Sequence, residues 1–102
     1  MMIRWFISRH NGAIEWAKRK ELPVDRWVPH LNIDEIRKGD VVMGTLPFAL
    51  AADVCSRGAA FYALDFQTEE SQRGKNLTAD DLTVAEACLQ RYTVVKGEEY
   101  VP

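Results

Sequence analysis

Four polar residues with useful chemistry stand together near the amino terminus: Ser8, Arg9, His10 and Asn11. They follow an apolar stretch and precede Gly12 and a segment with helical periodicity. The N-terminus of a helix presents free backbone N–H groups and the positive end of the helix dipole, and both favour anions. An arginine adds a full positive charge there, and a histidine can accept or donate a proton near neutral pH. The group therefore predicts a phosphate-binding turn, with His10 as a candidate for proton transfer.

The same four residues also have a purely structural interpretation. Asn11 would cap the helix, Arg9 would be solvated, and His10 would pair with a backbone carbonyl. The sequence alone favours neither interpretation over the other. For His30, which follows Pro29 near a weak strand, we expect a structural or border role.

Two further segments offer groups to a phosphate. Gly44 leaves a backbone that a ligand can approach closely, and Thr45 adds a hydroxyl donor. Taken alone, this pair is better explained as a plain strand–helix turn. Arg73 and its neighbours Gly74 and Lys75 lie in a polar loop that could close over a phosphate, although a solvated charge cluster is the default interpretation.

Several common chemistries have no signature in this chain. There is no His-Glu-x-x-His or paired-cysteine set for zinc, no P-loop, no Gly-x-Ser-x-Gly elbow and no Gly-x-Gly-x-x-Gly turn. We therefore expect no metal and no cofactor. Cys55 and Cys88 each lie in a helix-like apolar pattern, so we expect two buried free thiols.

Composition sets the broad class. The 102 residues predict one domain over residues 1–102, with 47% hydrophobic and 27% charged residues. A net charge of −2 is not that of a protein that coats duplex DNA, so an anionic ligand needs a local positive pocket. We find no signal segment and no apolar run of membrane-spanning length, and we expect a cytoplasmic protein.

Strands and helices alternate along the chain. We predict strands over 2–12 (running into the polar turn), 26–31 (a weak edge strand), 40–45, 59–65 and 92–95. We predict helices over 13–20 and 48–57 and a third helix that begins at Thr78. In the third helix, Thr78 and Asp81 have capping-box spacing, and the apolar stripe is Leu82, Ala85 and Leu89. A helical turn is expected at 32–38, and residues 97–102 are a tail or an extra edge hairpin. This alternation predicts an α/β fold with a mostly parallel sheet between helices. Ligands of such sheets bind outside the carboxyl ends of strands, where the loops 8–12 and 44–47 are expected.

Blocks in a fixed order resemble a known family. They are Ser8-Arg9-His10, Gly12-Ala13, Glu15-Trp16, His30-Leu31, Gly39-Asp40-Val41-Val42, Gly44-Thr45-Leu46-Pro47, Leu50-Ala51-Ala52, Val54-Cys55, Arg57-Gly58-Ala59, Arg73-Gly74 and Leu77-Thr78. Together they resemble the small CRISPR-associated proteins numbered sixteen in the Csx series, from about residue 4 to residue 90. Several ordered blocks are more specific than any single one.

The resemblance implies a fold and an activity. The fold would be a Rossmann-like three-layer sandwich akin to the CRISPR-associated Rossmann-fold (CARF) sensor domains. The protein would be a homodimer that binds cyclic tetra-adenylate across its two-fold axis and cleaves it, as a ring nuclease that switches off type III CRISPR signalling. Because the ligand is RNA, each 2′-hydroxyl could attack its own 3′-phosphate without a metal and leave a 2′,3′-cyclic phosphate.

The resemblance also suggests roles for individual residues. Arg9, His10 and Ser8 would form the catalytic group, with His10 as general base or acid. The ligand-binding residues would be Asn11, Gly12, Gly44, Thr45, Leu46 and Arg73. The alternative function is a non-catalytic module that binds cyclic oligoadenylate as a sponge or sensor. A third possibility is a small phosphoesterase that shares the fold only by analogy.

Overall fold

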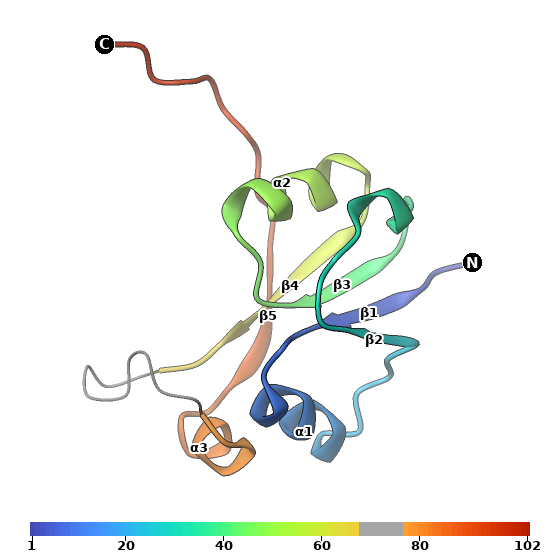
Figure 1. Ribbon diagram of the computed structural model, residues 1–102, viewed down its shortest axis with the longest axis vertical. Coiled ribbons are helices and arrows are strands. Elements are labelled where there is room, and N and C mark those ends of the chain that lie inside the picture. The colour runs from blue at the N-terminus through green and yellow to red at the C-terminus, as the bar shows by residue number, and fades with distance from the viewer. Residues whose placement is uncertain (68–76) are drawn as a thin grey trace.

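A five-stranded sheet runs through the middle of the molecule in the computed structural model, which describes residues 1–67 and 77–102 (Figure 1). The elements in chain order are β1 (Arg4–Ile7), α1 (Asn11–Arg19), β2 (Arg26–Val28), the 3-10 turn η1 (Ile33–Glu35), β3 (Val41–Gly44), α2 (Phe48–Ser56), β4 (Ala60–Asp65), α3 (Ala79–Val84) and β5 (Cys88–Tyr92). The strand order is β2-β1-β3-β4-β5, and only β5 runs antiparallel to its neighbour. The predicted α/β class and mostly parallel sheet are confirmed.

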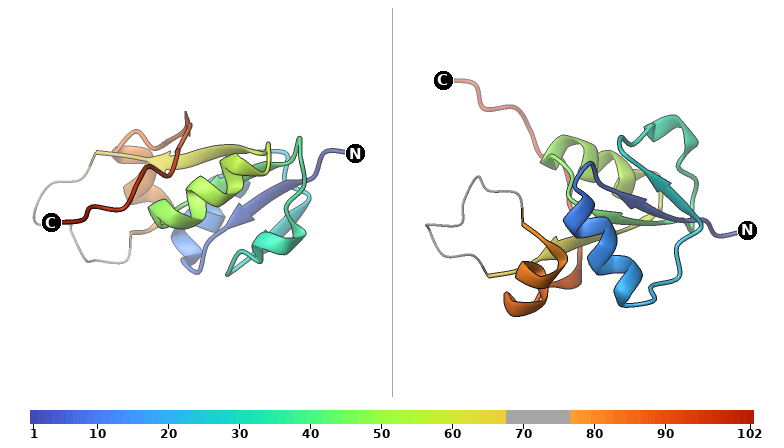
Figure 2. Two further views of the ribbon diagram at one scale, coloured as in Figure 1. Left: turned by 90° about the horizontal axis from the view of Figure 1, so that it is seen from above. Right: turned by 60° about the horizontal axis from the view of Figure 1, so that its bottom comes forward.

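Helices cover both faces of this sheet (Figure 2). Helices α1 and α3 pack on one face, and α2 and η1 pack on the other. Alternate residues of a strand point to opposite faces. Phe6 of β1 therefore packs in the core cluster under α1 and α3, while Trp5 and Ile7 pack in the cluster under α2 and η1. In β3, Met43 and Val42 divide in the same way, so this strand is covered on both sides.

Asp40 is a buried carboxylate at the start of β3, with a side chain 1% exposed. It accepts hydrogen bonds from the backbone N–H of Ile3 at 3.0 Å, the backbone N–H of Arg37 at 3.1 Å and the indole N–H of Trp5 at 3.3 Å. Burial raises the pKa of Asp40, but these hydrogen bonds together outweigh burial and leave the pKa below its usual range. The carboxylate therefore ties the start of β3 to β1.

The carboxyl-terminal third differs from prediction in its boundaries. The Thr78–Asp81 capping box is present, but α3 lasts only six residues because Glu86 adopts a positive φ of 56°. Leu89 is therefore not in a helical stripe. It lies in β5, opposite Leu64, so the prediction of a last strand at 92–95 was wrong. Spacing alone misled here, because an apolar residue four positions after Ala85 also fits the inward face of a strand.

Two smaller expectations are also settled. Both cysteines are free as predicted, but Cys88 is exposed on β5 rather than buried, and Cys55 is half-buried in α2. Residues 97–102 are a tail, not a hairpin, and they project from the body of the molecule (Figure 1). No helix in the described part of the chain is long and apolar enough to cross a membrane.

Candidate functional site

A cavity of about 360 Å³ opens at the carboxyl ends of β1, β3 and β4. Its lining is Ile7, Ser8, Arg9, His10, Ala13, Pro29, Thr45, Leu64, Phe66, Leu77 and Leu82. The chain leaves β1 toward β2 on one side and reaches β3 on the other side, so the strand order reverses between β1 and β3. The cavity therefore lies where parallel α/β sheets bind ligands, and the predicted meeting of the loops after β1 and β3 is confirmed.

The turn between β1 and α1 supplies one polar rim of the cavity. The Ser8 hydroxyl accepts a hydrogen bond from the backbone N–H of His10 at 3.0 Å and holds the turn closed. His10, not Asn11, is the N-cap residue of α1, and its side chain makes no capping hydrogen bond. Asn11 is the first helical residue, so the predicted capping role of Asn11 was wrong. The physical reason is that the hydrogen bond from His10 N–H to the Ser8 hydroxyl closes the turn one residue before Asn11, so His10 takes the N-cap position.

The electrostatics of this rim favour an anion. The first turn of α1 contains no acidic residue, and its last turn contains Lys18 and Arg19. The positive end of the helix dipole is thus not neutralised by a carboxylate of its own. Arg9 is exposed, and no salt bridge to it is found among the residues that the structure describes. An anionic ligand entering the cavity would therefore meet a guanidinium that none of the described carboxylates neutralises.

The turn between β3 and α2 supplies the opposite rim. Thr45 lines the cavity and is exposed. Gly44 has a φ of +132°, and a Cβ there would lie 2.2 Å from the carbonyl oxygen of Ile7. Glycine is therefore required by the packing of β3 against β1, whatever the ligand. Leu46 does not line the cavity but packs against the core under α2.

The remaining wall of the cavity is apolar and was not predicted. Leu64 and Phe66 come from the end of β4. Leu82 comes from α3, and Leu77 lies just before that helix. The cavity thus combines a cationic and hydroxyl rim with an apolar interior, which suits a ligand with a charged group and a flat apolar ring. The sequence held one indication of this wall, because apolar residues flank Asp65 at the carboxyl end of the predicted 59–65 strand.

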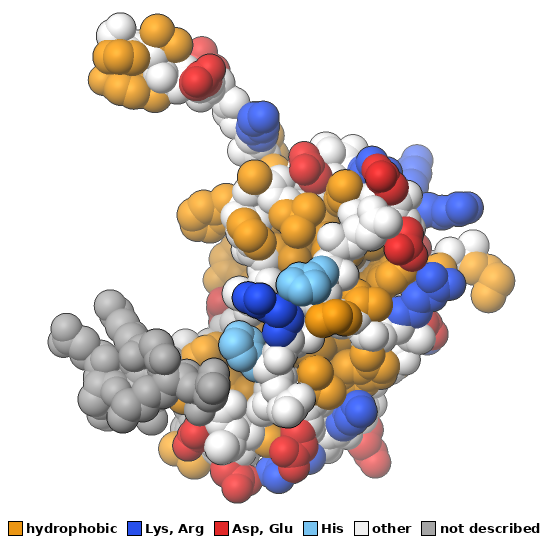
Figure 3. Space-filling model, viewed as in Figure 1, with side chains coloured by type: hydrophobic (Ala, Val, Ile, Leu, Met, Phe, Trp, Pro, Cys, Tyr) orange, Lys and Arg blue, Asp and Glu red, His pale blue; other side chains and the backbone are white. Residues whose placement is uncertain are grey.

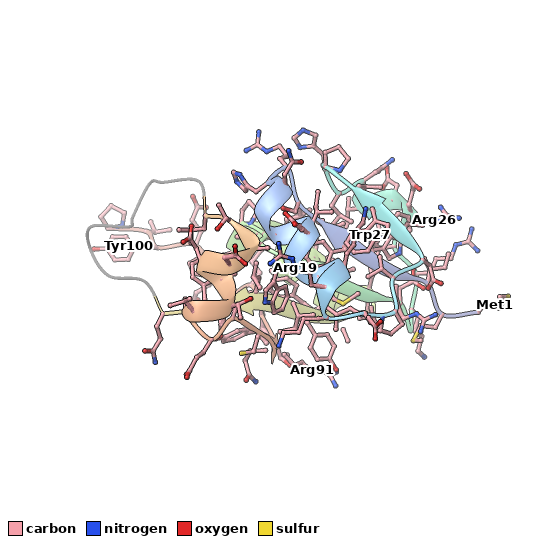
Figure 4. All side chains as sticks on the ribbon, turned by 90° about the horizontal axis from the view of Figure 1, so that it is seen from below. Met1, Arg19, Arg26, Trp27, Arg91 and Tyr100 are labelled. Carbon is pink, nitrogen blue, oxygen red and sulfur yellow. The ribbon has the colours of Figure 1, made fainter. Side chains whose placement is uncertain are left out.

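Gly12 contributes to the site through packing. A Cβ at Gly12 would lie 1.9 Å from the carbonyl oxygen of Leu77, so only glycine allows α1 to approach the chain entering α3. The two helices are also joined by Arg19, whose guanidinium donates to Asp80 at 2.7 Å and to Glu15 at 2.8 Å (Figure 4). Neither Gly12 nor Asn11 lines the cavity itself.

His30 is exposed and follows Pro29, a residue of the cavity lining, but does not line the cavity itself. The backbone N–H of Ser8 donates to the carbonyl oxygen of Val28 at 3.1 Å, and Pro29 lines the cavity. Both histidines of the chain appear on one face of the molecule, with a cationic side chain between them (Figure 3). Arg73 lies outside the described residues. Within the described ranges, no cluster of three metal-ligating side chains is found.

Fold and site together define an α/β protein with an anion-receptive, partly apolar cavity at the switch point of its sheet. The chain belongs to a family of CRISPR-associated proteins, since residues 5–95 match the family described as "Putative CRISPR-associated protein (Cas_VVA1548)". No curated protein and no solved structure matches the chain. CRISPR association, as the sequence resemblance implied, is thereby confirmed.

Proposed function

We propose that this protein is a ring nuclease that binds and cleaves cyclic oligoadenylate, with cyclic tetra-adenylate as the preferred ring. The observation that carries the proposal is the composition of the cavity in a CRISPR-associated protein. Arg9 and the first-turn N–H groups of α1 face a phosphate, while Phe66 and the leucines of the wall face a nucleobase. Cleavage would end type III CRISPR signalling by removing the second messenger.

The chemistry needs no metal. The 2′-oxygen of one nucleotide attacks its own 3′-phosphorus, the bond from phosphorus to the 5′-oxygen of the next nucleotide breaks, and a linear oligoadenylate with a 2′,3′-cyclic phosphate remains. The protein holds the attacking oxygen in line with the leaving oxygen. Arg9 and the helix N-terminus stabilise charge on the phosphoryl oxygens. His10 takes the proton of the 2′-hydroxyl, and Ser8 and Thr45 position phosphate or ribose.

A homodimer in the CARF-like manner is part of the proposal. A cyclic ligand with four phosphates has repeated anionic groups that suit two copies of one anion-binding turn related by a two-fold axis. Each chain would contribute one cavity.

Binding and cleavage separate this proposal from a sponge or sensor. Purified protein is mixed with cyclic tetra-adenylate, and protein-bound and free nucleotides are resolved by size-exclusion chromatography and identified by mass. A ring nuclease releases linear products. Intact ring that co-elutes with the protein would indicate a sponge, and intact ring that does not bind would contradict any role with this ligand.

A further inference from the structure

We infer that His30 is the second proton-transfer residue of the site, the general acid that protonates the departing 5′-oxygen while His10 accepts the proton of the 2′-hydroxyl. The inference rests on the proposed ring-nuclease function and adds a catalytic residue to it. Three features of the structure support this assignment: the position of His30 at the sheet edge, its relation to the cationic rim, and its place outside the cavity lining.

Strand pairing brings His30 to the site. Strands β1 and β2 run parallel, with Ile7 opposite Val28. The chain therefore leaves both strands at the same edge, and the hydrogen bond from Ser8 N–H to the Val28 carbonyl keeps them together just beyond their ends. Pro29 lines the cavity, and His30 is the next residue.

Two histidines on either side of one cationic group would suit an in-line displacement. The attacking and leaving oxygens stand on opposite sides of the phosphorus, so a base and an acid must flank the group that binds the phosphate. The space-filling view shows the two histidines on either side of a cationic side chain (Figure 3). Both are exposed, and among the described residues neither imidazole makes a recorded hydrogen bond.

Position relative to the cavity divides the two roles. His10 lines the cavity, which would hold the base and ribose of the attacking nucleotide. His30 does not line it and stands beyond Pro29 on the outside. The leaving 5′-oxygen belongs to the following nucleotide, which has to lie outside the cavity. His30 is therefore the histidine on the side of the leaving group.

Protons and bonds balance in this step. The O–H bond of the 2′-hydroxyl breaks and its proton goes to neutral His10, while the 2′-oxygen forms a bond to phosphorus. The bond from phosphorus to the 5′-oxygen breaks with its electron pair on oxygen, and protonated His30 gives its proton to that oxygen. Solvent then restores both imidazoles.

A sulfur-substituted substrate tests the assignment. Cyclic tetra-adenylate is prepared with sulfur in place of one bridging 5′-oxygen, and single-turnover cleavage of the normal and sulfur linkages is measured for wild type, His30→Ala, His30→Gln and His10→Ala. A thiolate is a much weaker base than an alkoxide and departs without a proton. Loss of a general acid should therefore slow the oxygen linkage by about 10²–10⁴-fold and leave the sulfur linkage within about tenfold of wild type. His10→Ala should slow both linkages.

The outcomes separate this inference from the function beneath it. If wild type cleaves neither linkage, the proposed function fails and the inference falls with it. If wild type is active but both His30 variants cleave both linkages at the wild-type rate, or slow both equally, His30 is not the general acid. Wild-type-like cleavage of the sulfur linkage by the variants also shows that they are folded.

Discussion

At the scale of single residues, Arg9 has the clearest task. It is exposed at the cavity rim beside a helix N-terminus, and none of the described salt bridges occupies it. Donors aimed at the charge that develops in a transition state commonly contribute about 10²–10³-fold in kcat. We predict that Arg9→Ala lowers the single-turnover rate on cyclic tetra-adenylate by this factor, as measured by quenched-flow and chromatography.

The matched control for this variant is Arg91→Ala. Arg91 is also an exposed arginine, but it lies on the edge strand β5 and does not line the cavity (Figure 4). Its variant should cleave within about twofold of wild type, since a distant exposed charge contributes little. Equal losses in the two variants would point to general electrostatic attraction of the ligand and contradict a specific role of Arg9.

Asp40 makes a residue-scale prediction about stability. In Asp40→Ala, the N–H donors of Ile3, Arg37 and Trp5 lose their shared acceptor, and an unsatisfied buried group costs about 1–3 kcal/mol. We expect a loss of about 3 kcal/mol in the free energy of unfolding, measured by urea titration at pH 7. Asp53→Ala, which removes an exposed carboxylate on α2, should change it by less than about 0.5 kcal/mol.

The lowered pKa of Asp40 also fixes the sign of its pH dependence. Because the folded pKa lies below that of the unfolded chain, the carboxylate stabilises the fold above the unfolded value of 3.8. This contribution is lost as the pH falls through the folded value. Wild type should therefore lose more stability than Asp40→Ala when urea titrations at pH 5 and at progressively lower pH are compared. Parallel curves for the two proteins would contradict the assignment.

At the scale of elements, the strand–turn–helix units near the amino terminus are readable from sequence. Residues 2–12 and 40–47 each combine a β-rich apolar run with a polar or glycine turn, and local chemistry decides both elements. The meeting of Ser8–His10 with Thr45 then follows from parallel pairing. The polar rim of the cavity was therefore predictable without knowledge of the tertiary structure.

Other parts of the site depend on contacts that no local pattern records. The apolar wall forms because α3, a short helix, packs beside α1, and because β5 turns back along β4. The chain reaches the cavity at Pro29 through a three-residue edge strand whose pairing partner the sequence does not specify. The spacing of Leu89 fitted the last helix, although this residue belongs to strand β5. In each case, tertiary pairing rather than local preference decides the structure.

Gly12 tests the contact between the two helices that shape the cavity. In Gly12→Ala the new methyl group meets the Leu77 carbonyl, and overpacking of about 1–3 kcal/mol exceeds the gain of up to about 1 kcal/mol that alanine brings to a helix. We predict a lower urea midpoint together with weaker ligand binding, since Leu77 lines the cavity.

The control for the Gly12 variant is Gly97→Ala. Gly97 is in the exposed tail, and no atom of the described residues lies within 4 Å of a Cβ placed there. That variant should keep its urea midpoint and its ligand affinity. An unchanged midpoint in Gly12→Ala would show that the chain before α3 can move away from α1 without cost.

At the scale of the whole molecule, the size of the cavity limits what one chain can hold. Its volume of about 360 Å³ is near the lower end of the range of about 300–1,000 Å³ for ligand sites, which is room for one nucleotide rather than a ring of four. Under the proposed function, a ring must therefore be shared between chains. We predict a homodimer by light scattering and one bound ring per two chains by calorimetry. The calorimetry uses a 2′-O-methylated ring, which lacks the attacking hydroxyl and therefore stays intact during the titration.

A different stoichiometry would require a different assembly. One ring per chain would mean that a single cavity and its surroundings bind the whole ligand, and the two-fold arrangement would be wrong. Arg9→Ala should remain a dimer while binding the ring more weakly, because its guanidinium faces the ligand site.

Metal-independent cleavage of cyclic oligoadenylate can be followed in a simple time course. Purified protein is incubated with cyclic tetra-adenylate in excess EDTA, and the products are resolved by mass. The proposed function predicts linear di- or tetra-adenylate ending in a 2′,3′-cyclic phosphate, formed by wild type and strongly slowed in Arg9→Ala. An intact ring after incubation with wild-type protein, in EDTA and with divalent metal alike, would contradict it.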